Sequence, residues 1–157
     1  MSHNPLSLVI STFVVAAWVG GHDPVALGGW TALLLVGQWL PVAAWETARK
    51  VRAPADETDY VTYSKTIGLT AAALVPGVLA VVAAAALGAV SRRAGLGPVY
   101  QVGVLASALL LLVRGLQCAV GPTTARANLR PIAELFAVVA GAGLCVALGG
   151  THGVRLG

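Results

Sequence analysis

Charged side chains are scarce in this sequence. Of its 157 residues, 10% are Asp, Glu, Lys or Arg, whereas 57% are apolar, and the mean hydropathy is +0.83. A soluble domain carries about 25% charged residues, and a disordered chain combines low hydrophobicity with high net charge. Both classes are therefore excluded. Since a membrane helix needs roughly 20 mostly apolar residues, the sequence predicts a small polytopic membrane protein that forms one domain, 1–157.

Residues that bind metals and cofactors are also few. Cys118 and Cys145 lie within apolar runs without a neighbouring His or second Cys, and His3, His22 and His152 are isolated. The chain contains no Gly-rich phosphate loop and no Ser nucleophile elbow. We therefore expect no metal and no cofactor. The ten Lys and Arg residues are spread along the chain, which argues against nucleic acid as a partner.

Five apolar segments alternate with shorter stretches that contain Pro or Gly. They are Leu6 to Gly20, Trp30 to Trp45, Thr66 to Val90, Val99 to Gly121, and Ile132 to Gly150. Apolar runs bounded by Gly and Pro are typical of membrane helices and their loops, so we predict an all-α bundle of five spans. The first segment is short and lacks the charged start of a signal peptide. If it does not cross the bilayer, the number of spans is four.

The cations favour one orientation of this bundle. With five spans, one side of the membrane receives Arg49, Lys50, Arg52, Lys65, Arg126 and Arg130, and the other receives Arg92, Arg93 and Arg155. Because Lys and Arg are enriched in cytoplasmic loops, we predict a protein of the cell inner (plasma) membrane with a cytoplasmic N-terminus. Arg outnumbers Lys eight to two, which is typical of GC-rich bacterial genomes.

Ionisable groups within the predicted spans are the first candidates for function, because each costs roughly 2.5 to 3.5 kcal/mol on insertion scales. Arg114 lies well inside the fourth segment, and Gln117 shares its helix face at i+3. Glu134 falls in the first turn of the fifth segment. Glu46 closes the second segment and follows Gln38 at i+8. Each also has a structural interpretation: an interhelical ion pair for Arg114, a helix-capping charge for Glu134 and a solvated helix end for Glu46.

The predicted topology brings these groups to the same, cytoplasmic, half of the bundle, where the two longest loops also lie. We predict Arg114, Glu134 and Glu46 as catalytic residues. The predicted substrate-binding residues are Gln117, Gln38, Asn128, Trp45 and Tyr63. A carboxyl group that moves a proton and a cation that stabilises an anion together suit acid/base chemistry on a hydrophobic molecule.

One stretch carries a family resemblance. Residues 113–129, VRGLQCAVGPTTARANL, contain a Gly-Pro-Thr-Thr turn at 121–124, then Arg126 and an Asn-Leu pair at 128–129. This stretch resembles the penultimate loop of small four-span membrane proteins of the anthrone-oxygenase-like and transmembrane-protein-205-like group. The resemblance covers 17 residues, and the chain departs from the group by its additional N-terminal apolar segment.

The resemblance implies a cofactor-independent membrane oxygenase that converts the activated methylene of a polyketide anthrone to a quinone. Glu134 or Glu46 would then be the base and Arg114 the partner of the enolate. Two alternatives stay open: a cyclase or isomerase for a polyketide- or isoprenoid-like substrate, and a non-enzymatic accessory or transport-related subunit. An open apolar cavity at Arg114 favours an enzyme, and a closed ion pair favours the accessory subunit. The expected partners are the lipid bilayer and a lipophilic small molecule, and a homo-oligomer is compatible with the sequence.

Overall fold

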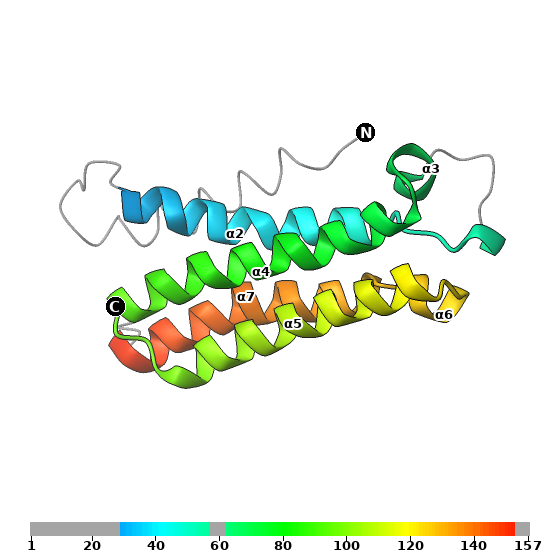
Figure 1. The fold of residues 1–157 in the computed structure, drawn as a ribbon. Helices are drawn as coiled ribbons and strands as arrows, with labels where there is room; N and C mark the ends of the chain where they lie inside the picture. Colours follow the sequence, from blue (N-terminus) through cyan, green and yellow to red (C-terminus); the bar gives the residue numbers. More distant parts are fainter. Residues whose placement is uncertain (1–28, 57–61, 153–157) are drawn as a thin grey trace.

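Four long helices lie side by side in the computed structural model, which describes residues 29–56 and 62–152. They are α2 (Gly29–Ala48), α4 (Leu69–Arg93), α5 (Pro98–Val120) and α7 (Arg130–His152), and consecutive members run antiparallel (Figure 1). The short pieces η1 (Pro54–Asp56), α3 (Tyr63–Ile67) and α6 (Thr124–Ala127) belong to the connections at one end of the bundle. We call this end, formed by residues 49–56, 62–68 and 121–129, the α3/α6 end. Every regular element among the described residues is helical, which confirms the predicted all-α class.

Glycine and proline lie at several of the helix boundaries, as the sequence predicts. Gly68, with a φ of 84°, separates α3 from α4, and Gly95, with a φ of 67°, lies in the turn between α4 and α5. A residue with a Cβ disfavours this left-handed conformation. Pro98 occupies the start of α5, where its missing N–H leaves no hydrogen bond unmade. The four predicted segments from Trp30 onward differ from the observed helices by three residues or fewer at each end.

Three of the helical segments are long and apolar enough to cross a membrane. They are Leu69–Arg93, Pro98–Val120 and the stretch Thr124–Thr151, which contains most of α7. The 20-residue α2 is not among them, because Gln38, Glu46 and its tryptophans interrupt its apolar run. The five-span number is therefore not confirmed. The first predicted span, Leu6 to Gly20, and Arg155 lie outside the described residues.

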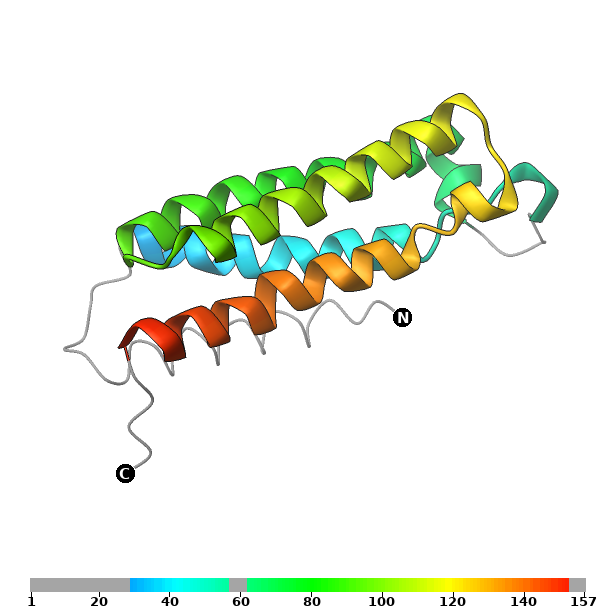
Figure 2. The same ribbon diagram turned by 90° about the horizontal axis from the view of Figure 1, so that it is seen from below.

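The four long helices form a bundle in which each packs against two neighbours. Helix α4 packs closely against α2 and α5, and α7 closes the bundle on the opposite side against the same two helices (Figure 2). Small residues permit the close contacts of α4. A Cβ on Gly77 would lie 2.5 Å from Leu112 Cα, and one on Gly115 would overlap the Ala73 carbonyl oxygen. The α4 and α5 backbones are therefore in direct contact, as is typical of membrane helices.

Helix α7 is held differently, through side chains rather than backbone contact. A Cβ on Gly143 would lie 3.4 Å from the Tyr100 ring, which is an ordinary van der Waals distance. Two side chains from opposite helices donate to one α7 carbonyl: Tyr100 Oη lies 3.0 Å from Ala140 O, and Gln38 Nε2 lies 3.4 Å from it. Such interhelical hydrogen bonds stabilise helix pairs where water is absent. The α5 and α7 backbones consequently stand further apart than those of α4 and α5.

The close contact of α4 with α5 predicts the effect of adding one methyl group. Gly77→Ala places a carbon against the α5 backbone, and we expect it to lower the free energy of unfolding by about 1 to 3 kcal/mol, the usual cost of overpacking. The measurement is thermal unfolding in detergent, followed by circular dichroism. Gly88→Ala on the same helix is the control, since no atom lies within 4 Å of its added carbon. Equal midpoints for the two variants would contradict the contact.

Candidate functional site

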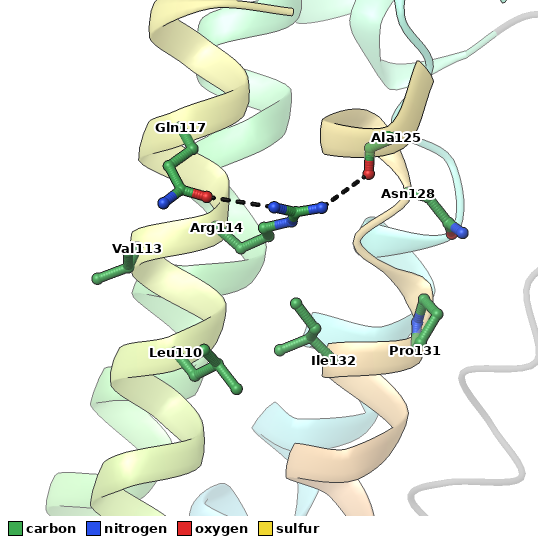
Figure 3. A pocket seen from close by; sticks show the side chains of 8 residues that line it. All are labelled: Leu110, Val113, Arg114, Gln117, Ala125, Asn128, Pro131 and Ile132. Carbon is green, nitrogen blue, oxygen red and sulfur yellow. Dashed lines mark hydrogen bonds between the residues drawn. The ribbon is translucent and has the colours of Figure 1, made fainter. Parts of the chain in front are cut away.

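A pocket of about 380 Å³ lies between α5 and the α6–α7 segment, towards the α3/α6 end (Figure 3). Its lining combines apolar side chains with one cation and two amides. The lining residues are Leu110, Val113, Arg114, Gln117, Ala125, Asn128, Pro131 and Ile132. The α5 members follow the spacing i, i+3, i+4 and i+7, which places them on one face of the helix.

Arg114 crosses the gap between the two walls of the pocket. Its Nη1 lies 3.3 Å from Gln117 Oε1 on the same helix, and its Nη2 lies 3.0 Å from the Ala125 carbonyl oxygen on α6. Figure 3 shows the guanidinium between α5 and α6, with Leu110 and Ile132 on its apolar side. Both partners are neutral, and within the described residues Arg114 makes no ion pair. No carboxylate among the described residues therefore compensates its positive charge.

Local folding of the α5–α6 turn prepares the acceptor for Arg114. The Thr123 hydroxyl accepts from the Arg126 backbone N–H at 3.2 Å and starts α6, as N-cap residues do. Arg126 Nη1 then donates to the Gly121 carbonyl at 3.0 Å and closes the turn. Helix α6 has only four residues, so its last carbonyls have no helical partner. The Ala125 carbonyl is thus available to the guanidinium.

Glu134 lies in a separate cluster, where α7 meets α2. Its Oε1 accepts from Arg130 Nε at 2.7 Å and from the indole Nε1 of Trp45 at 3.2 Å. Glu134 follows the pocket-lining Ile132 by two residues, which is about 200° around the helix. It does not line the pocket. The structure therefore does not bring Glu134 together with Arg114.

Glu46 is buried at the end of α2, with 8% of the residue exposed. Its Oε2 lies 3.6 Å from Arg49 Nε, and its Oε1 has no hydrogen-bond partner among the described residues. Arg49 also stands over the Trp45 ring, 5.3 Å from its centroid. Glu46, like Glu134, is absent from the pocket lining. Neither predicted catalytic carboxylate therefore faces the cavity at Arg114.

The remaining predicted residues are divided between the pocket and other places. Gln117 and Asn128 line the pocket with Arg114. Gln38 is half-buried in the middle of the bundle, where it binds α7, and Tyr63 lies on α3 beneath Lys50, whose Nζ is 5.1 Å from the ring centroid. Sequence reasoning missed the apolar lining: Leu110, Val113, Ala125, Pro131 and Ile132. The i, i+3, i+4, i+7 face around Arg114 is the signal that identifies its α5 members.

The chemistry of this arrangement is that of an anion site with apolar walls. The guanidinium has five N–H donors, of which two make the hydrogen bonds described above. The lining contains no carboxylate, so the pocket residues themselves offer a cation but no proton acceptor. Within the described part of the chain, no group of three or more His, Cys, Asp or Glu residues is placed to hold a metal ion.

No family model matches the chain, and neither a curated protein nor a solved structure matches it. The likeness of residues 113–129 to the anthrone-oxygenase-like group thus stays a prediction. The inference of function rests on the pocket and its charge.

The contact of Trp45 with Glu134 predicts coupled effects on stability. We expect Trp45→Phe and Glu134→Ala each to lower the unfolding midpoint by roughly 2 to 4 °C, because each removes the hydrogen bond between α2 and α7. The double variant should lose less than the sum, since the bond can be lost once. Circular dichroism during heating measures all three. Glu134→Gln is the control that keeps an acceptor for the indole, and strictly additive losses would contradict the coupling.

Proposed function

We propose that this chain is a small integral membrane protein that binds a hydrophobic small molecule in the α5–α6–α7 pocket, with an electron-rich oxygen of that molecule at Arg114. Three helical segments with the length and composition of membrane spans support the membrane setting. The pocket volume of about 380 Å³ and its mostly apolar lining are typical of small-molecule sites. The ligand is polyketide- or isoprenoid-like in this proposal.

One observation carries the proposal: a guanidinium at a mostly apolar pocket that has no carboxylate partner among the described residues. An arginine within a membrane span costs about 2.5 to 3.5 kcal/mol on insertion scales, and such residues usually pair with an acid or serve a function. Here both partners of Arg114 are neutral oxygens. A ligand oxygen that is negative, or becomes negative during a reaction, would supply the missing charge.

The same geometry supports a class of reaction. A fixed guanidinium stabilises the enolate of an activated methylene. The proton must pass to a base outside the pocket lining, which contains no carboxylate. Oxygenation by molecular oxygen, or cyclisation or isomerisation of the substrate, can proceed from such an enolate. Arg114 is the anion-stabilising residue in this proposal. Since Glu134 and Glu46 do not line the pocket, the support is stronger for binding and charge stabilisation than for proton transfer by either carboxylate.

A second candidate function is that of a non-enzymatic accessory subunit. One observation favours it: both predicted catalytic carboxylates interact with other side chains of the protein. Glu134 accepts from Arg130 and Trp45, and Glu46 faces Arg49. The Trp45–Glu134 hydrogen bond joins α2 to α7, and the two ion pairs are local, i,i+3 and i,i+4. None of these interactions needs a substrate. The two candidates differ in whether the pocket at Arg114 holds a molecule.

Arg114 variants of the purified full chain test the proposal. We expect a lipophilic compound to co-purify with the wild-type protein and to fall at least about tenfold in Arg114→Gln, the loss expected when a charged hydrogen bond is removed. Mass spectrometry of organic extracts measures the compound, and circular dichroism checks the fold. Ile132→Trp, which fills the pocket, should have the same effect. Arg92→Gln at the opposite end is the control.

Two results would contradict ligand binding at Arg114. One is a wild-type protein from which no compound co-purifies and whose stability Ile132→Trp does not alter. The other is a compound that stays bound at the wild-type level in both pocket variants. The first result favours the accessory subunit, and the second places the ligand elsewhere.

We also propose a five-span topology with a cytoplasmic N-terminus, in the inner membrane. The distribution of charge supports the orientation. Within the described residues the α3/α6 end carries Arg49, Lys50, Arg52, Lys65, Arg126 and Arg130, whereas the opposite end carries Arg92 and Arg93. The positive-inside rule then puts the α3/α6 end in the cytoplasm.

Labelling of single cysteines in intact cells tests this orientation. In a background in which Cys118 and Cys145 are changed to Ala, Gly97→Cys should react with a membrane-impermeant maleimide, because the exposed turn between α4 and α5 faces outward in the proposed topology. Asp56→Cys should react only after the membrane is permeabilised. The reverse pattern would show that the α3/α6 end is outside.

A further inference from the structure

The pocket changes from apolar to polar along the axis of the bundle. On α5, Leu110 comes first and Gln117 lies two turns closer to the α3/α6 end. On the other wall, Ile132 lies in α7 and Asn128 lies before that helix, again closer to the α3/α6 end. Arg114 spans the pocket between these levels (Figure 3). Both walls therefore suit a molecule with a polar part at Arg114 and an apolar part that extends away from the α3/α6 end, past Leu110 and Ile132.

The apolar part of the pocket adjoins the surface that faces the lipid. Leu110 and Val113 are 47% and 48% exposed, although they lie within a helix that has the composition of a membrane span. Exposed apolar residues on such a helix contact lipid chains in a bilayer. A molecule dissolved in the leaflet can therefore reach the pocket sideways, with its chain kept in apolar surroundings throughout.

The polar part of the pocket carries uncompensated positive charge. Neither Arg114 nor Arg126 makes an ion pair with another described residue, and Glu134, in its separate cluster, is held by Arg130. Arg126 follows Ala125, whose carbonyl binds Arg114, so both guanidinium groups belong to the α5–α6 turn. A tetrahedral phosphate has oxygens directed to several sides, and arginine binds them through paired N–H groups.

We propose that the pocket takes an amphiphile with a phosphate head from the leaflet at the α3/α6 end. The phosphate contacts Arg114, and the apolar chain lies between Leu110 and Ile132 and continues into the bilayer. This inference rests on the proposed function, because it specifies the chemical class of the molecule that the pocket binds. The ligand inferred here differs from a neutral lipophile in one property: its head carries a permanent negative charge.

Matched amphiphiles test this class. The full-length protein is held in micelles of a non-ionic alkyl maltoside, which carries no phosphate, and its unfolding midpoint is followed as the mole fraction of monoacylglycerol phosphate increases. A molecule that binds the folded protein raises the midpoint. The neutral monoacylglycerol with the same chain and inorganic phosphate alone are the two comparison compounds. Arg114→Gln is the test variant, and Arg92→Gln is the control.

The proposal predicts that monoacylglycerol phosphate raises the midpoint of the wild-type protein and of Arg92→Gln, whereas its apparent affinity falls about tenfold or more in Arg114→Gln. Arg114→Lys keeps the charge without the paired N–H groups and should lie between them. If Arg114→Gln fails to fold, Ile132→Trp replaces it and should also weaken binding.

Three outcomes would overturn the phosphate head while leaving the proposed function to its own test. In the first, neutral monoacylglycerol binds as tightly as monoacylglycerol phosphate, and Ile132→Trp abolishes the binding of both. The pocket would then bind a lipophilic molecule without requiring a charged head. In the second, inorganic phosphate gives the same shift, so that the chain plays no part. In the third, none of the compounds shifts the midpoint, and the co-purification experiment alone decides whether the pocket holds another molecule.

Discussion

The backbone contact between α4 and α5 is the constraint on which the rest of the bundle depends. Gly77 and Gly115 remove the side chains that would otherwise separate these helices, so α5 is fixed against α4 on one side. Its opposite side then faces α7 across a wider interval, because side chains such as Tyr100 stand between them. The direction of the Arg114 side chain depends on the same contact. Arg114 neighbours Gly115 in sequence, and the face it shares with Leu110 lines the pocket. Packing on one face of α5 thus creates room on the other.

The charged side chains at the α3/α6 end form two regions, which differ in whether each charge has an oppositely charged partner. Between α2 and α7, each carboxylate has a cation beside it, Arg49 for Glu46 and Arg130 for Glu134. Between α5 and α7, Arg114 has neutral partners. In the first region each carboxylate is paired with a cation close in sequence, and the Trp45–Glu134 hydrogen bond joins α2 to α7. The second leaves a positive charge next to apolar walls, which is costly unless an external anion completes it. This difference is the reason for placing function in the pocket rather than among the carboxylates.

The sequence predicts the helices well and the site in part. Apolar runs ended by Gly and Pro locate the four long helices to within three residues, because these residues act on the local backbone. The antiparallel order of the helices also predicts that one end of the bundle carries Glu46, Arg114, Gln117 and Glu134. It does not predict the rotation of each helix about its own axis. Two residues along α7 turn the side chain by about 200°, so Ile132 faces the pocket and Glu134 faces Trp45. That rotation is set by packing against two other helices, and a single sequence does not encode it in any local pattern.

A crystal structure grown from a lipidic mesophase would test the central claim most directly, since it shows what stands against the Arg114 guanidinium. We predict a bound molecule between Leu110 and Ile132, with an oxygen at hydrogen-bond distance from Arg114 and no carboxylate of the chain in contact with the guanidinium. A pocket closed by side chains, with Glu134 or another acid of the protein paired to Arg114, would contradict the account. Arg114 would then be a structural lock between helices.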